Sequence, residues 1–392
     1  MRDDGAEHIV WLSGQHWDQD GGTHRAMATG MSAYSRILWV DPPTSPVTRN
    51  RKDHNVAPVL VQVADNVTCL RPVALPLHSR PGIRASTPLL VRAQVRWAIR
   101  KLGFHPSAVV MLYLGGLLDG WGSGVVKVMY GTDDYVAGAG LMGISARYLL
   151  RRERKDLAKA DVVVAVSPEL ARRWTDIGPS PVVIPNGCWP LSGVMENLPA
   201  VEVDLPSPVV GLIGRLSSRI DLDALEAIAD SGQSLVLMGP LDARLDAERF
   251  HKLARKPSVR YMGPIPSAEL PAYLAAIDVG ITPYRDSAFN RASFPLKTLE
   301  YLSAGLPVVT SDLPAMRWLR ADLEETESSD LADQILVLAE SSQDYVRAVK
   351  LIASGDSDTA SHRIAFARRH SWTNRAEQFA TVLGLPSSSH AN

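Results

Sequence analysis

The residues best suited to chemistry lie in the segment FPLKTLEYLSAGLPVV, residues 294–309. Lys297 and Glu300 are three residues apart, and the surrounding leucines recur at helical spacing, so the segment predicts an amphipathic helix with both charges on one face. A helix start attracts phosphate through its free amides and its dipole, and a lysine there strengthens the attraction. A carboxylate can accept hydrogen bonds from two ribose hydroxyls. The pattern predicts a nucleotide site, although an ordinary surface Lys–Glu pair has the same spacing.

A second group of candidate residues follows an apolar run upstream, where residues 208–213 predict a buried strand. Gly214 frees the backbone after this strand, and Arg215 and Arg219 follow it four residues apart. Two guanidinium groups at the carboxyl end of a strand fit a diphosphate better than a ligand of single charge. Nearby aspartates leave a solvated charged face as the alternative for Arg219.

Two adjacent aspartates, Asp133 and Asp134, follow the apolar run Val125–Met129. If that run is a strand of a parallel sheet, both carboxylates lie at the sheet edge where ligands bind. Crowding of two carboxylates raises one pKa toward the working pH, which suits a general base beside an electrostatic neighbour. Adjacent aspartates in a loop also make turns and helix caps, so that role stays open.

The loop GQHWDQDGGTHR, residues 14–25, combines two histidines with two glycines. His16 and His24 can act on an acceptor because imidazole exchanges protons near neutral pH, but a loop histidine without a chemical role is the alternative. Gly21 and Gly22 either leave their amides open to a phosphate or sugar, or form a flexible turn.

Composition limits the class of protein to which these candidate residues can belong. A chain of 392 residues, 46% of them apolar, exceeds what one core usually organises, so two domains are expected. A formal net charge of −1 gives no global reason to bind nucleic acid. Cys69 and Cys188 are far apart, which argues against a disulfide framework or zinc site, and we expect no metal. No apolar run is long enough to cross a bilayer, so a cytoplasmic protein is expected.

The elements that must position these side chains follow a βα rhythm. Short apolar runs alternate with helix-length segments, as in parallel sheets. The first predicted sheet contains Ile9–Leu12, Ile37–Val40, Val109–Tyr113, Val125–Met129 and Val162–Val166. The second contains Val209–Ile213, Leu235–Met238, Val259–Met262, Val279–Thr282 and Pro307–Thr310. A stretch rich in proline and glycine separates the two sets and predicts a linker.

Taken together, these segments resemble the nucleotide-sugar glycosyltransferases of the GT-B fold, in particular bacterial enzymes that build teichuronic acids, exopolysaccharides and related glycans. The resemblance covers most of the chain and rests on motifs in a shared order. They are IVWLSGQHWDQDGGTHRAM, VMYGTDDYVAG, ERKDLAKADVVVAVSPEL, VIPNG, VGLIGRLSSRIDLDAL, LVLMGP and the segment of residues 294–309.

The resemblance implies two Rossmann-like domains that face each other across a cleft. Their boundaries are predicted at residues 1–190 for the acceptor domain, 191–207 for the linker, 208–355 for the donor domain and 356–386 for terminal helices that cross back.

The resemblance also implies roles for individual residues. Glu300 would hold the donor ribose, and Asp133 would activate the acceptor. A common retaining pattern has a second glutamate eight residues before the ribose-binding one, where this chain has Ala292, so the stereochemical outcome stays open. The donor-binding residues would be Gly21, Gly22, Gly214, Arg215, Arg219, Tyr284, Lys297 and Glu300, and the catalytic candidates Asp133, Asp134 and His24.

A basic helix is predicted over residues 80–101, because Arg92, Arg96 and Arg100 recur every four residues beside apolar side chains. Such a helix can dock on anionic lipid or hold a phosphate-bearing acceptor. A solvated face over a packed stripe is the common alternative. We therefore expect peripheral contact at the inner membrane face to involve this helix, if the protein contacts a membrane.

The sequence predicts a metal-independent glycosyltransferase that moves a sugar from a nucleoside-diphosphate donor to a hydroxyl or amine, on a small-molecule or lipid-linked glycan acceptor. No cofactor beyond the donor substrate and no nucleic-acid partner is expected. A sugar-nucleotide epimerase of the same fold is one alternative. A non-catalytic protein that binds nucleotide sugars is the other.

Overall fold

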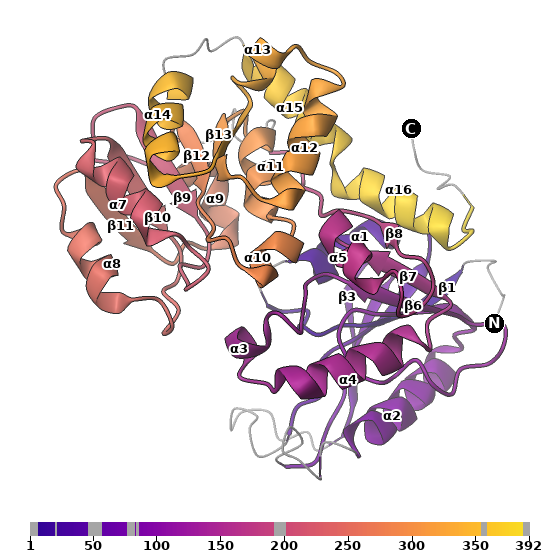
Figure 1. Cartoon of the computed structure of the whole chain (residues 1–392). Coiled ribbons are helices and arrows are strands. Elements are labelled where there is room, and N and C mark those ends of the chain that lie inside the picture. Colours follow the sequence, from indigo (N-terminus) through magenta and orange to yellow (C-terminus); the bar gives the residue numbers. More distant parts are fainter. Residues whose placement is uncertain are drawn as a thin grey trace. The chain divides into compact units, whose positions relative to one another are not determined.

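The computed structural model describes residues 7–19, 22–45, 57–76, 83, 86–191, 201–353 and 359–386. The chain forms two compact units (Figure 1). Unit 1 contains Met1–Pro185 and Trp372–Asn392, and unit 2 contains Asn186–Ser371. Within the described ranges, every helix is too short or too polar to span a membrane.

An eight-stranded sheet forms the core of unit 1, in the order β3-β4-β2-β1-β5-β6-β7-β8. Its strands are parallel except for β3, which pairs with β4 in antiparallel fashion. The order reverses between β1 and β5, which is where α/β sheets bind ligands at their carboxyl ends. The strands are β1 His8–Leu12, β2 Arg36–Val40, β3 Val59–Ala64, β4 Val67–Arg71, β5 Pro106–Met111, β6 Val126–Gly131, β7 Val162–Ala165 and β8 Val182–Val183.

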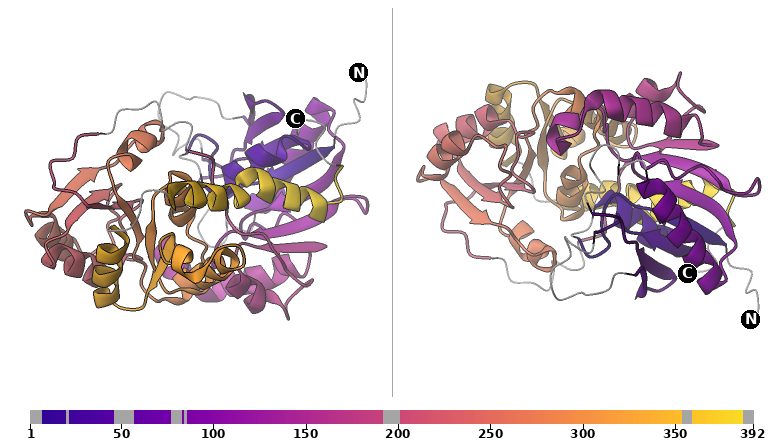
Figure 2. Two further views of the ribbon diagram at one scale, coloured as in Figure 1. Left: turned by 90° about the horizontal axis from the view of Figure 1, so that it is seen from above. Right: turned by 90° about the horizontal axis from the view of Figure 1, so that it is seen from below.

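Helices pack on this sheet, and the last one comes from the far end of the chain. Helix α16 lies beside α1 (Figure 2) because Gly30 of α1 has no side chain, and a Cβ there would come within 2.8 Å of the Ala376 Cβ. Phe379 of α16 packs on Trp11 and Tyr130 of the sheet, with ring centroids 5.7 and 5.4 Å apart. The helices are α1 Thr23–Met31, α2 Thr87–Leu102, α3 Ala139–Met142, α4 Ala146–Leu157, α5 Pro168–Trp174 and α16 Trp372–Val382.

A six-stranded parallel sheet forms the core of unit 2, in the order β11-β10-β9-β12-β13-β14. Numbered from β9, this is the 3-2-1-4-5-6 order of a dinucleotide-binding sheet, with its switch point between β9 and β12. Side chains of β9, β10 and β12 are fully buried because helices cover the sheet. The strands are β9 Val209–Ile213, β10 Ser234–Met238, β11 Val259–Gly263, β12 Val279–Thr282, β13 Val308–Ser311 and β14 Leu336–Ala339.

Capping side chains fix where two of the helices of unit 2 begin. Asp221 accepts from the Asp223 amide at the start of α7, and Asp246 accepts from the Arg249 amide at the start of α8. The helices are α7 Leu222–Asp230, α8 Ala247–Ala254, α9 Leu270–Leu274, α10 Ala288–Ala292, α11 Leu296–Ser303, α12 Pro314–Glu324, α13 Ser329–Ala332, α14 Ser342–Ala353 and α15 Ala360–Arg369.

Helix α11 is fixed to the carboxyl edge of the second sheet by its buried face. The Ile213 amide at the end of β9 donates to Tyr301 Oη at 2.7 Å. The Tyr301 ring lies over Gly280 of β12, where an added Cβ would approach the ring within 2.4 Å. On the same helix face, Thr298 lies 3.2 Å from the Thr282 hydroxyl. Gly305, with φ of 80°, then ends the helix in the left-handed conformation.

The observed strands confirm the two predicted sheets and the α/β class. The prediction missed three strands of the first sheet, the antiparallel pair β3 and β4 and the short edge strand β8, and it missed β14 of the second. Strand β3 is only half-buried, so it lacks the continuous apolar run that marked the central strands.

Candidate active site

Lys297 and Glu300 lie in the first two turns of α11 and are paired with each other. Lys297 Nζ donates to Glu300 Oε2 at 2.5 Å, and the two side chains are 27% and 24% exposed. Neither side chain is used to fill the core, because the buried face of the helix carries Thr298, Leu299 and Tyr301. A cation and a carboxylate therefore lie at a helix start, each neutralised by the other.

The glycine that follows β9 leaves space directly beside Lys297. A Cβ at Gly214 would be 3.9 Å from Lys297 Cγ, and the φ of Gly214 is 145°. Gly239, after the neighbouring strand β10, has φ of 136°, and a Cβ there would lie 1.9 Å from the Gly214 carbonyl oxygen. Both glycines are required by backbone conformation, and together they bring two strand ends close to the lysine.

Arg215 is the most exposed cation of this group, with 68% of its side chain accessible. Its guanidinium lies 4.0 Å from Asp242 Oδ2, which is a weak contact. Asp242 is already engaged, because hydrogen bonds from the Arg244 side chain and amide lower its pKa to about 2. Arg215 is thus free to turn toward a ligand at the end of β9.

Arg219 is held in one orientation by a buried amide and two rings. Its Nε donates to Asn290 Oδ1 at 2.8 Å, and its guanidinium lies 5.0 Å from the Tyr284 ring centroid and 4.7 Å from that of Phe289. Asn290 is 1% exposed and donates to the carbonyls of Arg219 and Arg285 at 3.2 and 2.9 Å. Tyr284, predicted to bind ligand, thus packs against the arginine in this structure.

These residues share the switch point of the second sheet. Gly214 and Arg215 follow β9, Tyr284 follows β12, and α11 is tied to both strands. The group carries an excess of positive charge over the single carboxylate of Glu300. Within the described ranges, no cluster of three or more histidine, cysteine or acidic residues could hold a metal ion. The chemistry available here is recognition of anionic oxygens by cations and amides.

In unit 1, His24 is a buried member of a directional hydrogen-bond chain. The Gly14 amide donates to His24 Nδ1 at 3.3 Å, which leaves Nε2 to donate to Thr132 Oγ1 at 3.1 Å. Thr132 Oγ1 lies 3.1 Å from Tyr135 Oη, which donates to the Leu112 carbonyl at 2.5 Å. Burial lowers the pKa of His24 to about 3, so the imidazole is neutral at physiological pH. His24 therefore links the loops after β1, β5 and β6.

Asp133 and Asp134 differ in environment although they are adjacent. Asp134 is 4% exposed, accepts from the Ala137 amide at 2.8 Å and forms an ion pair with Arg173 at 3.0 Å. Arg173 also pairs with the buried Glu153, so Asp134 belongs to a structural charge network. Asp133 is half-buried at the end of β6, beside the His24 chain through its neighbour Thr132.

The loop after β1 contains a histidine that has an acidic partner. His16 Nδ1 lies 3.4 Å from Asp41 Oδ2, and His16 is 34% exposed while Asp41 is 4% exposed. Asp41 Oδ1 accepts from the Trp17 amide at 2.9 Å and from Trp39 Nε1 at 2.8 Å. Burial raises the pKa of Asp41, but the hydrogen bonds from His16, Trp17 and Trp39 outweigh burial and hold it below its usual range.

Of the two loop glycines predicted to bind the donor, the structure describes only Gly22. Gly21 lies outside the described residues. Gly22 precedes the first turn of α1 in an extended conformation, with φ of −133°, and a Cβ there would lie 3.3 Å from Gln15 Oε1. Gln15 is exposed and its amide oxygen is the far end of a flexible side chain, so packing alone does not require glycine at this position.

The arginines of α2 only partly match the predicted docking face. Arg92 donates to the Gly116 carbonyl at 3.2 Å, and Arg96 donates to the Gly120 carbonyl at 3.0 Å. Both side chains therefore hold the loop that follows β5. Arg100 is exposed at the end of the helix. The α2 arginines are in part structural, which the four-residue spacing could not reveal.

Two residues of the candidate site were missed by the sequence analysis. Asn290 holds Arg219, and its only signal was a polar residue inside a short helix capped by Ser287. Asp41 orients His16, and its signal was an acid directly after the apolar strand β2. Both partners are far apart in sequence, so spacing could not connect them.

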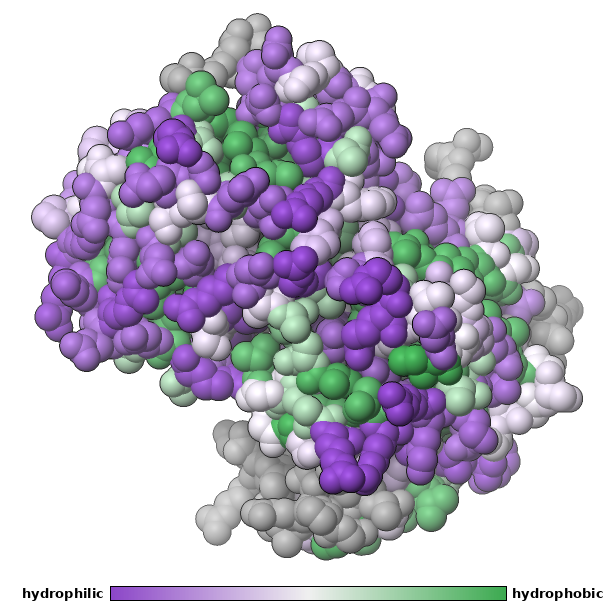
Figure 3. Space-filling model, viewed as in Figure 1, coloured by the Kyte–Doolittle hydropathy of each residue, from purple (hydrophilic) through white to green (hydrophobic). Residues whose placement is uncertain are grey.

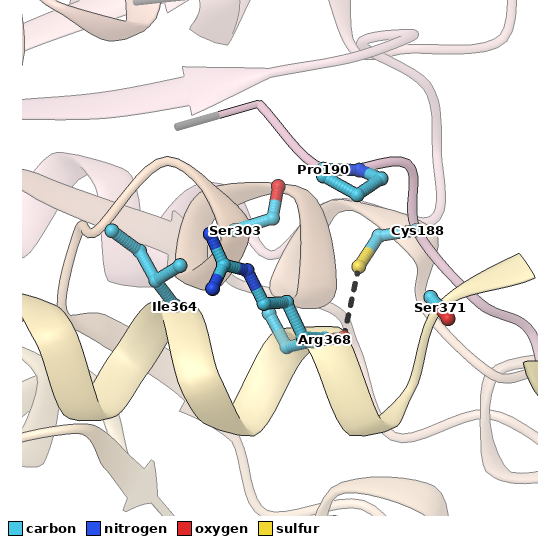
Figure 4. Close-up of a pocket in the computed structure, with 7 residues that line it drawn as sticks. Cys188, Pro190, Ser303, Ile364, Arg368 and Ser371 are labelled. Carbon is cyan, nitrogen blue, oxygen red and sulfur yellow. Dashed lines mark hydrogen bonds between the residues drawn. The ribbon is translucent and has the colours of Figure 1, made fainter. Parts of the chain in front are cut away.

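A small depression elsewhere in unit 2 is not part of this site. It lies at the C-terminal end of α11 against α15, where Cys188 Sγ lies 3.4 Å from the Ala367 carbonyl oxygen (Figure 4). Ser303, Ile364 and Arg368 also line it, and no acidic side chain does. It is at the opposite end of α11 from Lys297.

Residues 207–354 match the family model of glycosyl transferases group 1. The chain is 38% identical over 109 residues to TuaH of Bacillus subtilis, a proposed teichuronic acid biosynthesis glycosyltransferase. That match covers 27% of this chain and 27% of the relative.

Solved structures match nearly the whole chain at lower identity. A sucrose-phosphate synthase from Thermosynechococcus elongatus is 20% identical with a TM-score of 0.69, over 96% of this chain and 98% of that one. Anabaena HepE, solved with UDP, is 16% identical with a TM-score of 0.61, over 96% and 99% of the two chains. These matches confirm the predicted GT-B fold.

Proposed function

We propose that this chain, which has the GT-B fold, is a group 1 glycosyltransferase that moves a sugar from a nucleoside-diphosphate donor to a hydroxyl or amine of a small-molecule or lipid-linked glycan acceptor. One observation carries the proposal. Lys297 lies beside Gly214 and Arg215 at the switch point of the second sheet, with Glu300 one turn further along α11. The match to the curated relative covers 27% of its length, so the substrates of that relative are not carried over to this chain.

The donor is assigned to unit 2, within the predicted domain 208–355. Lys297, Arg215 and the first amides of α11 would bind the diphosphate, and Arg219 would support it from its fixed position over Tyr284. Glu300 would accept hydrogen bonds from the ribose hydroxyls. Binding would separate the Lys297–Glu300 pair and give each charge a ligand partner. The UDP bound to HepE supports a nucleoside diphosphate as the ligand class.

The leaving diphosphate would be stabilised by these fixed cations. Charge develops on the diphosphate as the glycosidic bond breaks, and preorganised cations lower the energy of that state. A divalent metal does the same in other enzymes. We propose that the cations of unit 2 replace it, so that transfer does not depend on added metal.

The acceptor is assigned to unit 1. Asp133 is proposed to accept the proton of the attacking hydroxyl, because its half-buried carboxylate follows β6 at the ligand-binding edge. Asp134 would hold the loop through Arg173. His24 is proposed to position this loop through Thr132, since a buried imidazole with a pKa near 3 is a poor base. His16, oriented by Asp41, is the next candidate if Asp133 proves dispensable.

The alternatives are less well supported. The comparisons favour a nucleotide-sugar glycosyltransferase over an epimerase, because the matched relatives and structures include a glycosyltransferase and a sugar-phosphate synthase. An epimerase would change a donor sugar without any acceptor. A protein that only binds nucleotide sugars would be stabilised against thermal unfolding by the donor but would form no product.

A thermal-shift panel of nucleoside diphosphates and their sugars tests the donor assignment. A ligand that binds only the folded state at a hundredfold excess over its Kd adds about 2.7 kcal/mol to the free energy of unfolding. The correct base should raise the melting temperature of the wild type but not that of a folded Lys297→Ala/Glu300→Gln variant. An equal shift in both proteins would refute the site.

A further inference from the structure

Helix α4 of unit 1 turns both of its acids inward. Glu153 is fully buried and pairs with Arg173 of α5. Asp156 is 2% exposed, accepts from Arg152 at 2.7 Å and also accepts from the Gly116 amide at 3.3 Å. Both acids of α4 are therefore buried and paired, Glu153 with Arg173 and Asp156 with Arg152 of the same helix, and neither contributes negative charge to the outer face.

The outer face of α4 carries only positive charge. Arg147, Arg151, Arg154 and Lys155 are all exposed, and their i, i+4, i+7, i+8 spacing places them on one stripe of the helix. Among the residues that the structure describes, none of these four forms an ion pair with an acid. The chain as a whole has a formal charge of −1, so this stripe is a local concentration of charge.

Apolar side chains are exposed where α3 meets α4. Met142 is 41% exposed and Ile144 is 39% exposed, on either side of Gly143. A Cβ at Gly143 would have no described atom within 4 Å, so the turn stands clear of the described parts of the unit. Hydrophilic and hydrophobic residues lie side by side on this face of the protein (Figure 3).

We propose that this surface, formed by Met142, Ile144 and the four cations of α4, docks on a bilayer that contains anionic phospholipid. Four cations without acidic partners match a negatively charged surface, and each cation contributes favourable binding free energy close to the anionic headgroups. The two exposed apolar side chains precede the charged stripe and can enter the acyl boundary, as in interfacial helices. A soluble acidic glycan would satisfy the charges but gives no role to Met142 and Ile144.

Vesicle co-sedimentation of the full chain tests the proposal without any need for turnover. The probes are vesicles of phosphatidylcholine alone and vesicles in which about a third of the lipid is phosphatidylglycerol. Arg151→Gln/Lys155→Gln removes two charges of the stripe. The matched control, Lys252→Gln/Arg255→Gln, removes two exposed charges at the end of α8 in unit 2.

The wild type and the control should bind the anionic vesicles equally, and the stripe variant should bind them about tenfold or more weakly. A Met142→Ser/Ile144→Ser variant should also bind less, while keeping the dependence on salt. All variants should keep the wild-type melting temperature because the altered side chains are exposed. Equal binding by the stripe variant and the control would overturn the proposal. So would binding of soluble polygalacturonate without binding of anionic vesicles.

Discussion

Replacement of Glu300 by glutamine should have opposite effects on two ligands. The Glu300 carboxylate lies 2.5 Å from the Lys297 ammonium. Both side chains are about a quarter exposed, at 27% and 24%, so the pair should contribute only about 0–1 kcal/mol to stability. Glutamine removes this restraint on Lys297 but also removes the charged acceptor proposed for the ribose.

The magnitudes follow from these two roles. A nucleoside diphosphate loses a charge-assisted hydrogen bond, which costs about 1.5–3 kcal/mol. The release of Lys297 returns about 0–1 kcal/mol of this, so the Kd should rise by about 2-fold to 150-fold. Inorganic pyrophosphate makes no ribose contact and finds a freed Lys297, so its affinity should rise by up to about fivefold. Lys297→Ala should weaken both ligands.

Isothermal titration of both ligands against the full chain measures this pattern. Arg347→Ala is the matched control, because it removes the cation of another i, i+3 ion pair on a helix of unit 2, formed with Asp344. The control should bind both ligands as the wild type does. A folded Glu300→Gln protein with unchanged nucleoside-diphosphate affinity would remove Glu300 from the site, and weaker pyrophosphate binding would refute the idea that it restrains Lys297.

Three further outcomes are expected. Asp133→Asn should keep donor affinity while turnover falls by about 10²- to 10⁴-fold. Asp134→Asn should mainly lower the free energy of unfolding, by about 1–3 kcal/mol. Near-normal turnover of Asp133→Asn would make His16 the next candidate for the general base. His24 is neutral in the folded protein and becomes protonated below about pH 6.5 in the unfolded chain, so the free energy of unfolding should fall by about 1.4 kcal/mol per pH unit between pH 6.5 and 3. Denaturant titrations of a His24→Gln variant should lack this part of the pH dependence. An unchanged pH dependence in the variant would contradict a buried neutral imidazole. Turnover should persist in excess chelator; loss that magnesium or manganese restores would contradict catalysis by fixed cations.

The sequence predicted elements whose local pattern agreed with their final environment. The helix of Lys297 and Glu300 was predicted because its leucine spacing and the terminal Gly305 both reflect how it packs. Strand β3 was missed because it lies at a sheet edge and is half-buried, which gives no continuous apolar run.

Side-chain partners were the least predictable part of the candidate site. Asn290 and Arg219 are 71 residues apart, and His24 and Thr132 are 108 apart, so only the folded chain brings them together. The arginines of α2 had a spacing typical of a docking surface, yet two of them hold backbone carbonyls. The α4 stripe became visible only when Glu153 and Asp156 were found to be buried.

Sugar transfer itself tests the proposed function most directly. The full chain is incubated with each nucleoside-diphosphate sugar that raises its melting temperature, together with a panel of glycan acceptors, and both products are quantified by mass spectrometry. A glycosyltransferase should yield free nucleoside diphosphate and glycosylated acceptor in equal amounts, both strongly reduced in Lys297→Ala. A donor that is bound tightly but returned unchanged with every acceptor, or converted to a different sugar nucleotide without acceptor, would contradict the proposed function.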